Sequence, residues 1–189
     1  MAPVRALVSP FSVRSRVSAE KVTTTGGTSL VGAERIFADV ALTTSGLWRN
    51  HGFELVLSGQ AAQVSDNRYR FSRPNLESLG YVYSRGYAYV PTDLFGKVSG
   101  NYRFPLFYPD FALGAWIYLR RISANLYFDY TAIQDEARDI SLSSGGSELT
   151  FETNAFRVFP LDIGIRHIRR FDSNDDIVEA YLRSVFVEF

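Results

Sequence analysis

The chain has 189 residues, with 20 Lys and Arg against 20 Asp and Glu, so its formal net charge is zero, and it contains no Cys. The neutral balance argues against a nucleic-acid partner, which requires a basic surface, and the lack of Cys excludes disulfides and thiolate metal sites. No segment approaches the roughly 18 consecutive apolar residues of a membrane-spanning helix. Aromatic residues make up 15% of the chain, a share that suits soluble β-sandwiches and outer-membrane β-barrels.

Polar and apolar residues alternate along eight segments, which predicts β-strands because the side chains of a strand point to two faces in turn. Leu94 and Val98, for example, fall on one parity, and Lys97 and Asn101 fall on the other. The predicted strands span residues 3–18, 31–44, 52–64, 94–105, 121–131, 147–158, 160–170 and 178–189. These spans contain 11 to 16 residues, which at roughly 3.3 Å per residue is enough for a tilted strand that crosses an outer membrane.

The connections between these strands differ in character. We expect a Thr- and Gly-rich connection at 20–28, a shorter one at 46–52, a long loop at 65–93, an apolar turn at 106–120, a polar loop at 134–146, a turn at Phe159 and Pro160, and an acidic loop at 172–176. Polar loops fall at one end and mostly tighter turns at the other. With an even number of strands, both chain ends lie on the tight-turn end, which is the periplasmic side of bacterial barrels.

The pattern predicts one domain over residues 1–189: an all-β, antiparallel, up-and-down transmembrane β-barrel of about eight strands, or half of a larger barrel, whose long loop 65–93 lies inward or outside the cell. The alternative is a soluble eight-stranded barrel with the apolar parity as its core. The membrane barrel predicts a paired polar lumen wall that includes Asp39, Glu54, Lys97, Arg103, Glu152, Asp162 and Arg166. It also predicts aromatic residues at two rims: Phe104, Phe107, Tyr108, Phe111, Trp116, Tyr118 and Phe159 at one, and Tyr81, Tyr83, Tyr87, Tyr89 and Tyr130 at the other.

Two short motifs occur in an informative order. Ser84-Arg85-Gly86-Tyr87 lies in the long loop, and Tyr-Phe-Asp-Tyr-Thr follows at residues 127–131. Together they resemble the bacterial surface-antigen superfamily of outer-membrane barrel-assembly factors and two-partner-secretion transporters. The C-terminal barrel half of that family carries an aliphatic-Arg-Gly-aromatic loop motif and then an aromatic-x-Asp-x-Gly strand motif. Five strands follow the loop motif there, as we also count here, and the resemblance covers about residues 31–189. Ser84 stands where the family usually has an aliphatic residue, and Thr131 where it has Gly.

Asp129 lies on the polar parity of its predicted strand and would point into the lumen of a closed barrel. A long loop that carries a guanidinium could fold inward and hold this carboxylate with two parallel hydrogen bonds, and Gly86 would permit the backbone turn. We therefore hypothesise a contact between Arg85 and Asp129. In the alternative arrangement, Arg85 lies in a solvated outer loop and Asp129 pairs with a wall residue such as Arg103.

The last predicted strand ends on an apolar column. Tyr181, Val185, Val187 and Phe189 occupy alternate positions, interrupted by Arg183. The column resembles the C-terminal signal by which outer-membrane barrels are delivered to the assembly machinery, and the alternative is an ordinary terminal strand that happens to end on Phe. In the signal interpretation, this strand pairs with an exposed strand edge of that machinery.

The chain carries few of the residue patterns that are typical of catalytic or metal-binding sites. No Gly-x-Ser-x-Gly elbow, phosphate-binding loop or dinucleotide fingerprint occurs, so we expect neither an enzyme nor a cofactor. His51 and His167 lack Cys or carboxylate neighbours at metal-ligand spacing, and we expect no metal site. Asp172, Asp175 and Asp176 could bind Ca²⁺, but a solvated acidic loop explains them better, and we expect that arrangement.

The resemblance implies a non-enzymatic module for protein insertion or translocation in the bacterial outer membrane. Its partners would be the lipid bilayer, the outer-membrane assembly machinery and another chain that completes the barrel. Two alternatives remain open from the sequence. One is a structural barrel that anchors or completes a larger outer-membrane complex, and the other is the soluble eight-stranded ligand-binding barrel.

Overall fold

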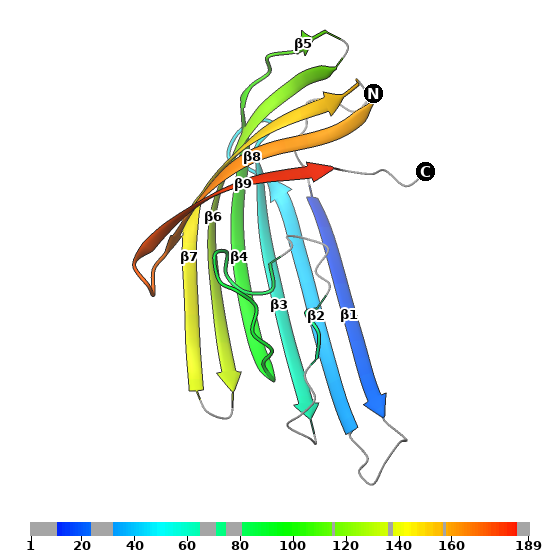
Figure 1. Cartoon of the computed structure of the whole chain (residues 1–189), viewed down its shortest axis with the longest axis vertical. Coiled ribbons are helices and arrows are strands. Elements are labelled where there is room, and N and C mark those ends of the chain that lie inside the picture. Colours follow the sequence, from blue (N-terminus) through cyan, green and yellow to red (C-terminus); the bar gives the residue numbers. More distant parts are fainter. Residues whose placement is uncertain are drawn as a thin grey trace.

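The computed structural model describes residues 11–23, 32–64, 71–74, 81–114, 116–135, 138–156 and 158–184. These residues form the strands β1 (Phe11–Thr23), β2 (Gly32–Ser45), β3 (Gly52–Val64), β4 (Leu94–Phe107), β5 (Phe111–Leu113), β6 (Ile117–Asp135), β7 (Arg138–Ala155), β8 (Phe159–Arg170) and β9 (Asp175–Ser184). They make one antiparallel sheet in the order β1-β2-β3-β4-β6-β7-β8-β9, and β5 pairs with β6 beside this path (Figure 1). The predicted all-β, up-and-down architecture is therefore confirmed. The described residues contain no helix long and apolar enough to cross a membrane.

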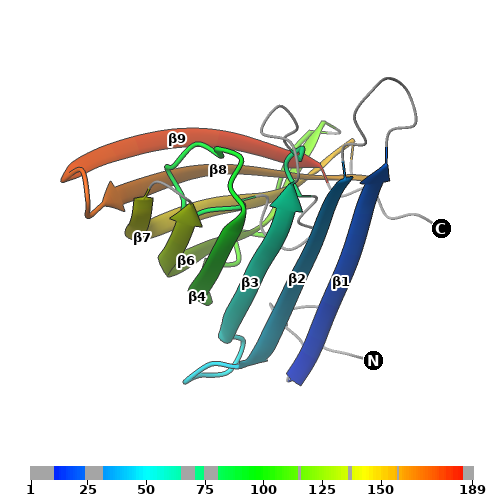
Figure 2. The ribbon, with the colours of Figure 1, turned by 90° about the horizontal axis from the view of Figure 1, so that it is seen from below.

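The described strands form an open sheet, so they do not by themselves close a barrel of about eight strands. The other predicted arrangement, half of a larger barrel, stays a prediction. Among the described residues, β1 pairs with β2 alone and β9 pairs with β8 alone. Figure 2 shows the strands as an arc that has β1 at one end and β9 at the other. The alternation of side chains fixes the two faces of each strand, but it does not fix how far the whole sheet curves, and closure depends on that curvature.

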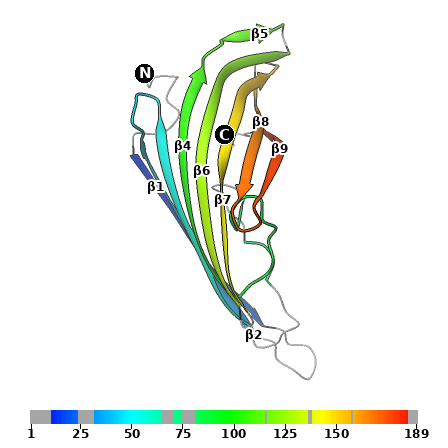
Figure 3. The same ribbon diagram turned by 90° about the vertical axis from the view of Figure 1, so that its left-hand side faces the viewer.

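Part of the expected apolar turn at 106–120 is a strand. Residues Phe111 to Leu113 form β5, which makes a hairpin with the start of β6 and places Phe111 opposite Leu119. This hairpin extends the sheet beyond the end of β4 (Figures 1 and 3). The run of apolar residues is therefore compatible with strand pairing, although it shows no period-two alternation that would have predicted a strand.

The expected polar loop at 134–146 is mostly strand. The antiparallel pairing of β6 with β7 extends through this region up to the pair of Asp135 and Arg138. The Ser- and Gly-rich composition suggested a loop, but small residues are needed here because two strands approach closely. A Cβ atom on Gly146 would lie 2.0 Å from the carbonyl oxygen of His167 and 2.8 Å from the Tyr127 hydroxyl.

The two faces of the sheet differ sharply in polarity. The concave face buries polar and charged side chains, which include Arg35, Asp39, Glu54, Lys97, Asn101, Asp129, Glu152 and Arg166. The opposite face exposes apolar side chains, which include Ile36, Leu57, Leu94, Val98, Leu126, Phe128, Ile165, Val178 and Leu182. The division follows the two parities of the sequence, and the polar parity is the buried one.

Residues 81–93, which we call the inner segment, lie on the concave side of the sheet (Figures 1 and 3). They belong to the predicted long loop 65–93, of which residues 65–70 and 75–80 lie outside the described residues. A small apolar core of Phe37, Val82, Tyr83 and Phe95 joins this segment to β2 and β4. The backbone N–H of Ala62 donates to the Asp93 carbonyl oxygen at 2.7 Å, which fixes the end of the segment to β3.

Candidate functional site

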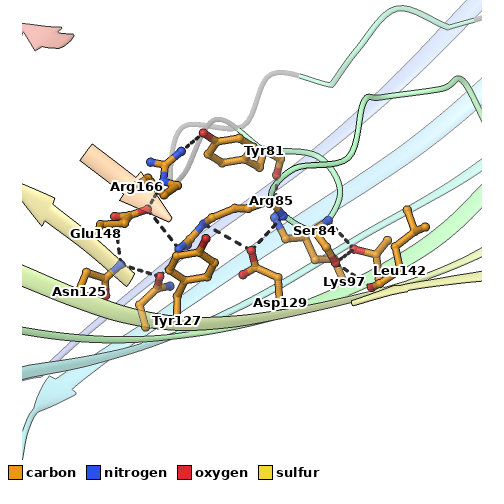
Figure 4. A network of polar contacts seen from close by, with 12 residues as sticks. Tyr81, Ser84, Arg85, Lys97, Asn125, Tyr127, Asp129, Leu142, Glu148 and Arg166 are labelled. Carbon is orange, nitrogen blue, oxygen red and sulfur yellow. Dashed lines mark hydrogen bonds and ion pairs between the residues drawn. The ribbon is translucent and has the colours of Figure 1, made fainter. Parts of the chain in front are cut away.

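Arg85 lies at the centre of a polar network on the concave face (Figure 4). Its side chain is 1% exposed, and that of Asp129 on β6 is 0% exposed. The Arg85 backbone N–H donates to Asp129 Oδ2 at 3.1 Å, and the guanidinium Nε lies 3.4 Å from the same oxygen. The hypothesised contact between these residues is therefore present. Arg103, the alternative partner of Asp129, donates instead to Glu54 Oε2 at 2.9 Å.

The Arg85 guanidinium spreads over several partners, so the expected pair of parallel hydrogen bonds to Asp129 was wrong. Its Nη2 donates to Asn101 Oδ1 on β4 at 2.6 Å, and its Nη1 lies 3.4 Å from Glu148 Oε1 on β7. The guanidinium carbon lies 3.8 Å from the centre of the Tyr127 ring on β6, a cation–π contact. One buried cation thus connects three strands, and two carboxylates offset the cost of removing it from water.

Ser84 fixes the residue that precedes Arg85. Its backbone N–H donates to Thr131 Oγ1 at 2.9 Å, the two hydroxyl oxygens are 2.9 Å apart, and Ser84 Oγ donates to the Leu142 carbonyl oxygen at 2.9 Å. Ser84 and Thr131 are both 0% exposed. They are the two positions at which the chain departs from the motifs that it resembles, and they contact each other. An aliphatic residue at position 84 could not make these side-chain bonds.

Gly86 allows the inner segment to turn next to β8. Its φ of +85° lies in the left-handed region that L side chains disfavour. A Cβ atom at this position would lie 3.0 Å from Ile168 Cγ2 and 3.2 Å from Arg170 Cδ, so the available space also favours glycine. The Gly86 carbonyl oxygen accepts a hydrogen bond from Arg170 Nη1 at 3.3 Å.

Tyr87 fastens the inner segment to the turn between β8 and β9. Its hydroxyl donates to Asp172 Oδ2 at 2.7 Å, and the Ser143 backbone N–H donates to the same oxygen at 2.7 Å. Burial, and then the hydrogen bond with Asp172, raise the pKa of Tyr87 to about 12. Burial opposes ionisation of Asp172, but the hydrogen bonds from Tyr87 and Ser143 outweigh it and hold the pKa of Asp172 below its usual value. The pair is therefore a neutral phenol bound to a carboxylate.

Other contacts hold the beginning and the end of the inner segment. Lys97 Nζ donates to the Tyr81 carbonyl oxygen at 2.8 Å. Arg166 hydrogen-bonds the Tyr81 hydroxyl, and its guanidinium carbon lies 4.9 Å from the Tyr81 ring centre (Figure 4). At the other end, Gln60 Nε2 donates to the Thr92 carbonyl oxygen at 2.7 Å. The segment is thus bound to strands from β3 to β8.

The seven residues expected in the lumen wall all lie on the concave face, where charged side chains pair across strands. The ion pairs include Arg103 with Glu54 at 2.9 Å, Arg121 with Glu152 at 2.5 Å, Arg183 with Asp162 at 3.0 Å, and Arg166 with Glu148. Asp39 accepts a hydrogen bond from Ser58 Oγ at 2.7 Å. A cavity of about 800 Å³, partly lined by these residues, remains between the wall and the inner segment.

Aromatic side chains gather at one end of the sheet, as expected for one of the two rims. Phe107, Phe111, Trp116 and Phe159 lie at the end that carries β5, and they are between 57% and 67% exposed. The prediction of a second aromatic rim was wrong. Four of its members, Tyr81, Tyr83, Tyr87 and Tyr89, belong to the inner segment. Tyr83 is 2% exposed and packs in the small core, whereas Tyr130 lies on the outward face and is 42% exposed.

Tyr181 is the one residue of the proposed C-terminal signal that the structure describes, because Val185, Val187 and Phe189 lie outside the described residues. It does not belong to the exposed apolar face. Its hydroxyl lies 2.6 Å from Thr150 Oγ1, and its ring covers Gly164, where a Cβ atom would lie 2.2 Å from Tyr181 Cζ. The large apolar residues that β9 exposes include Val178 and Leu182.

The acidic turn and the two histidines are engaged by protein groups. In the described part of the chain, no three His, Asp or Glu residues are grouped so that they could hold a metal ion. Tyr87 binds Asp172, Arg170 binds Asp175, and Arg169 and His167 bind Asp176. His51 Nδ1 lies 2.8 Å from the Tyr102 hydroxyl, and its ring stacks on Phe104 with centroids 5.5 Å apart.

Asn101, Tyr127 and Glu148 are partners of Arg85 that the sequence did not predict. All three share the polar parity of Asp129, which was the available signal, but parity does not reveal how neighbouring strands are aligned. The strand register places Asn101 opposite Tyr127, and Glu148 opposite Asn125.

Comparison of the chain with protein-family models, with curated proteins and with solved structures yields no match.

Proposed function

We propose that the chain is a module of a bacterial outer-membrane β-barrel, with its exposed apolar face against lipid and its concave face toward the lumen. One observation carries this proposal: Phe128 is 52% exposed, whereas Asp129, the next residue on β6, is 0% exposed. In water, such a sheet would expose apolar surface and bury ions, and both are unfavourable. In a bilayer, the apolar face is stabilised. A soluble ligand-binding barrel requires the opposite arrangement of the two parities.

The dimensions of the strands support the same proposal. β2, β3 and β4 have 14, 13 and 14 residues, and β6 has 19. About 9 to 11 residues suffice for a strand that crosses a bilayer at a tilt near 45°. The outward positions of β3 from Phe53 to Ala61, and of β6 from Ile122 to Ala132, contain no charged residue. A continuous uncharged band of this kind is what a lipid-facing surface requires.

Within this architecture, we assign the module a non-enzymatic role in protein insertion or translocation. The resemblance of its two motifs to those of barrel-assembly factors and two-partner-secretion transporters supports this role. The contact between Arg85 and Asp129 supports it further, because it joins the loop motif to the strand motif at 3.1 Å. The partners would be the bilayer, the outer-membrane assembly machinery and further strands that complete the barrel.

A structural module that anchors or completes a larger complex is a second candidate. The observation that favours it is the density of contacts around the inner segment, which is bound to β3, β4, β6, β7 and β8. A segment held this firmly suits a static plug better than a moving gate. The two roles share the membrane location and differ in whether the lumen conducts or assists other chains.

The membrane location can be tested with the two Trp residues of the chain. Trp48 and Trp116 lie in turns at the same end of the sheet and are 66% and 67% exposed. After refolding into liposomes, lipids brominated near the headgroups should quench both residues more strongly than lipids brominated at the chain ends. Trp48→Phe and Trp116→Phe report on each residue separately. A chain that stays folded in detergent-free buffer and shows no quenching would contradict the proposal.

The role can be tested in the same liposomes. An insertion or translocation module should conduct ions or accelerate the folding of a second outer-membrane protein, and Asp129→Ala should change that activity because it loosens the inner segment. Thr44→Ala is a suitable control because Thr44 is exposed on the outward side of β2, away from the network. Full membrane insertion with neither activity would favour the structural candidate.

A further inference from the structure

The two edge strands of the sheet carry backbone groups that would be unpaired in the membrane of the proposed function. Among the described residues, β1 and β9 have no neighbour on their outer sides, and β1 alone has 13 residues. Alternate backbone N–H and C=O groups of an edge strand point away from the sheet. In hydrocarbon, each unpaired group costs several kcal/mol, so open sheet edges do not occur there. In a membrane, both edges must therefore be paired.

Pairing of β1 with β9 of the same chain is disfavoured by what lies on the concave face. The interior of an eight-stranded barrel is filled by side chains or holds at most one small ligand. Here, the inner segment, the core around Tyr83 and Phe95, and a cavity of about 800 Å³ all lie on that side of the sheet. A peptide segment with its own core is larger than one small ligand, so closure of the eight-strand path on itself would not accommodate it and more strands are required.

We propose that a second copy of this chain supplies these strands, so that β9 of each copy pairs with β1 of the other. This inference rests on the proposed membrane location. The path has eight strands of alternating direction, so β1 and β9 run in opposite directions. Antiparallel pairing of β9 with the β1 of a second copy therefore leaves both copies oriented the same way through the membrane. A twofold axis along the membrane normal closes a ring of sixteen strands, whose wider lumen holds both inner segments.

The concave sides of the two edges have complementary charges. Arg14 and Arg16 lie on the concave side of β1, because they pair with Ala41 and Asp39, which are buried there. Glu179 lies on the concave side of β9, where it pairs with Arg166 at 3.6 Å and its side chain is still 39% exposed. In one antiparallel register Glu179 faces Arg16, and in the register two residues away it faces Arg14. Both registers place a cation opposite this carboxylate.

The outward sides of the edges also match. On β1, Val13 and Val17 are 55% and 72% exposed, and on β9, Val178 and Leu182 are 70% and 68% exposed. When Glu179 faces an arginine on the concave side, these apolar residues fall together on the lipid side, since neighbouring positions alternate between faces. The pairing thus continues both the polar and the apolar face across the junction.

The absence of Cys allows a direct cross-linking test. Ser15 on β1 and Ala180 on β9 are exposed on the outward side, and they face each other when Arg16 faces Glu179. Ser15→Cys and Ala180→Cys chains are mixed, refolded into liposomes and oxidised. A covalent dimer should form in the mixture and in neither variant alone. Val13→Cys replaces Ser15→Cys for the other register. Leu126→Cys, at an outward position inside the sheet with 51% exposure, is the control and should not cross-link.

Other outcomes of the cross-linking experiment would contradict the proposal. Cross-linking of the double variant Ser15→Cys/Ala180→Cys within one chain would overturn the proposal, because it would show self-closure. Dimers from Ser15→Cys alone would also overturn it, because like edges would then pair. Quenching of Trp48 and Trp116 is measured in the same samples. Normal quenching without a cross-link in any pair would overturn the second copy while leaving the membrane location intact, whereas loss of quenching would overturn the membrane location itself.

Charge reversal tests the complementarity of the edges. Glu179→Lys should lower the yield of the mixed cross-link about fivefold, because it places like charges opposite each other. A compensating Arg16→Glu, or Arg14→Glu in the other register, should restore the yield. A yield that Glu179→Lys leaves unchanged would contradict the charge argument.

Discussion

The inner segment is held in two different ways on its two sides. Toward β2 and β4 it packs through aromatic rings: Tyr83 meets Phe95 edge-on with centroids 5.4 Å apart, and Phe95 lies 6.5 Å from Phe37. Toward β6, β7 and the turn between β8 and β9 it is held by directed polar contacts of Arg85 and Tyr87, and Arg85 also donates to Asn101 on β4. One side of the segment is thus a small hydrophobic core, and the other is an ionic network.

The two kinds of contact contribute differently to the stability of the segment and to the specificity of its position. Burial of aromatic surface stabilises a contact without a strong directional preference. Hydrogen bonds to charged groups require particular atoms at particular distances, so they determine which residue of the segment lies over which strand. We therefore expect changes on the aromatic side to cost the most stability, and changes on the ionic side to loosen or shift the segment with smaller losses.

The largest effect is expected from Phe95→Ala. Phe95 is 2% exposed and contacts both Phe37 and Tyr83, so truncation leaves a cavity and should lower the free energy of unfolding by about 3 kcal/mol or more. Leu94→Ala is the matched control, because Leu94 is the neighbouring residue on the outward face and is 44% exposed. Its loss should be about 1 kcal/mol. Urea titration in lipid vesicles measures both, and equal losses would show that the aromatic side does not hold the segment.

Asp129→Ala should have the next largest effect. It removes one partner of a buried ion pair, a change that typically costs about 3 kcal/mol, and here somewhat less because Arg85 keeps Asn101 and Glu148. The segment should also become accessible to trypsin at Arg85, whose side chain is 1% exposed in the native protein.

Arg85→Ala and the double variant Arg85→Ala/Asp129→Ala complete a double-mutant cycle for this pair. A coupling of about 1 kcal/mol or more is expected because the two groups share one buried network. Trypsin cannot cut at position 85 in two of these variants, so chymotrypsin at the neighbouring Tyr residues reports their accessibility. Additive losses would mean that the contact between Arg85 and Asp129 contributes nothing beyond packing.

The sequence predicted the faces of this sheet better than its connections. Alternation along β3, β4 and β6 assigned residues such as Lys97 and Asp129 to the polar face, because a strand has a period of two whatever its neighbours are. The order of the two motifs predicted the contact between Arg85 and Asp129. Three features could not be derived from the sequence: whether the sheet closes, the register that brings Asn101 and Glu148 to Arg85, and the extension of β7 across Gly146. All three depend on contacts between distant segments.

The smallest effect concerns Tyr87 and is best seen as a change in pH dependence. Tyr87→Phe removes the hydrogen bond to Asp172, which is partly exposed and should contribute about 0.5–1 kcal/mol. Tyr89→Phe is the matched control, because the Tyr89 hydroxyl has no hydrogen-bond partner within the described residues. A spin label on Ala88→Cys, an exposed position between these two residues, reports the mobility of the segment.

The direction of each pH effect follows from the two pKa shifts. The pKa of Tyr87 is raised from 10.0 to about 12, so its contribution is fully present below pH 10.0 and is lost as the pH rises through about 12. The pKa of Asp172 is lowered from 3.8, so its contribution is present above pH 3.8 and is lost as the pH falls below it. The label should therefore be least mobile at intermediate pH. In Tyr87→Phe the alkaline increase should disappear, and the acidic increase should move to higher pH, because Asp172 has lost a donor that favoured its charged form. An alkaline increase that persists in Tyr87→Phe would show that another group controls this side of the segment.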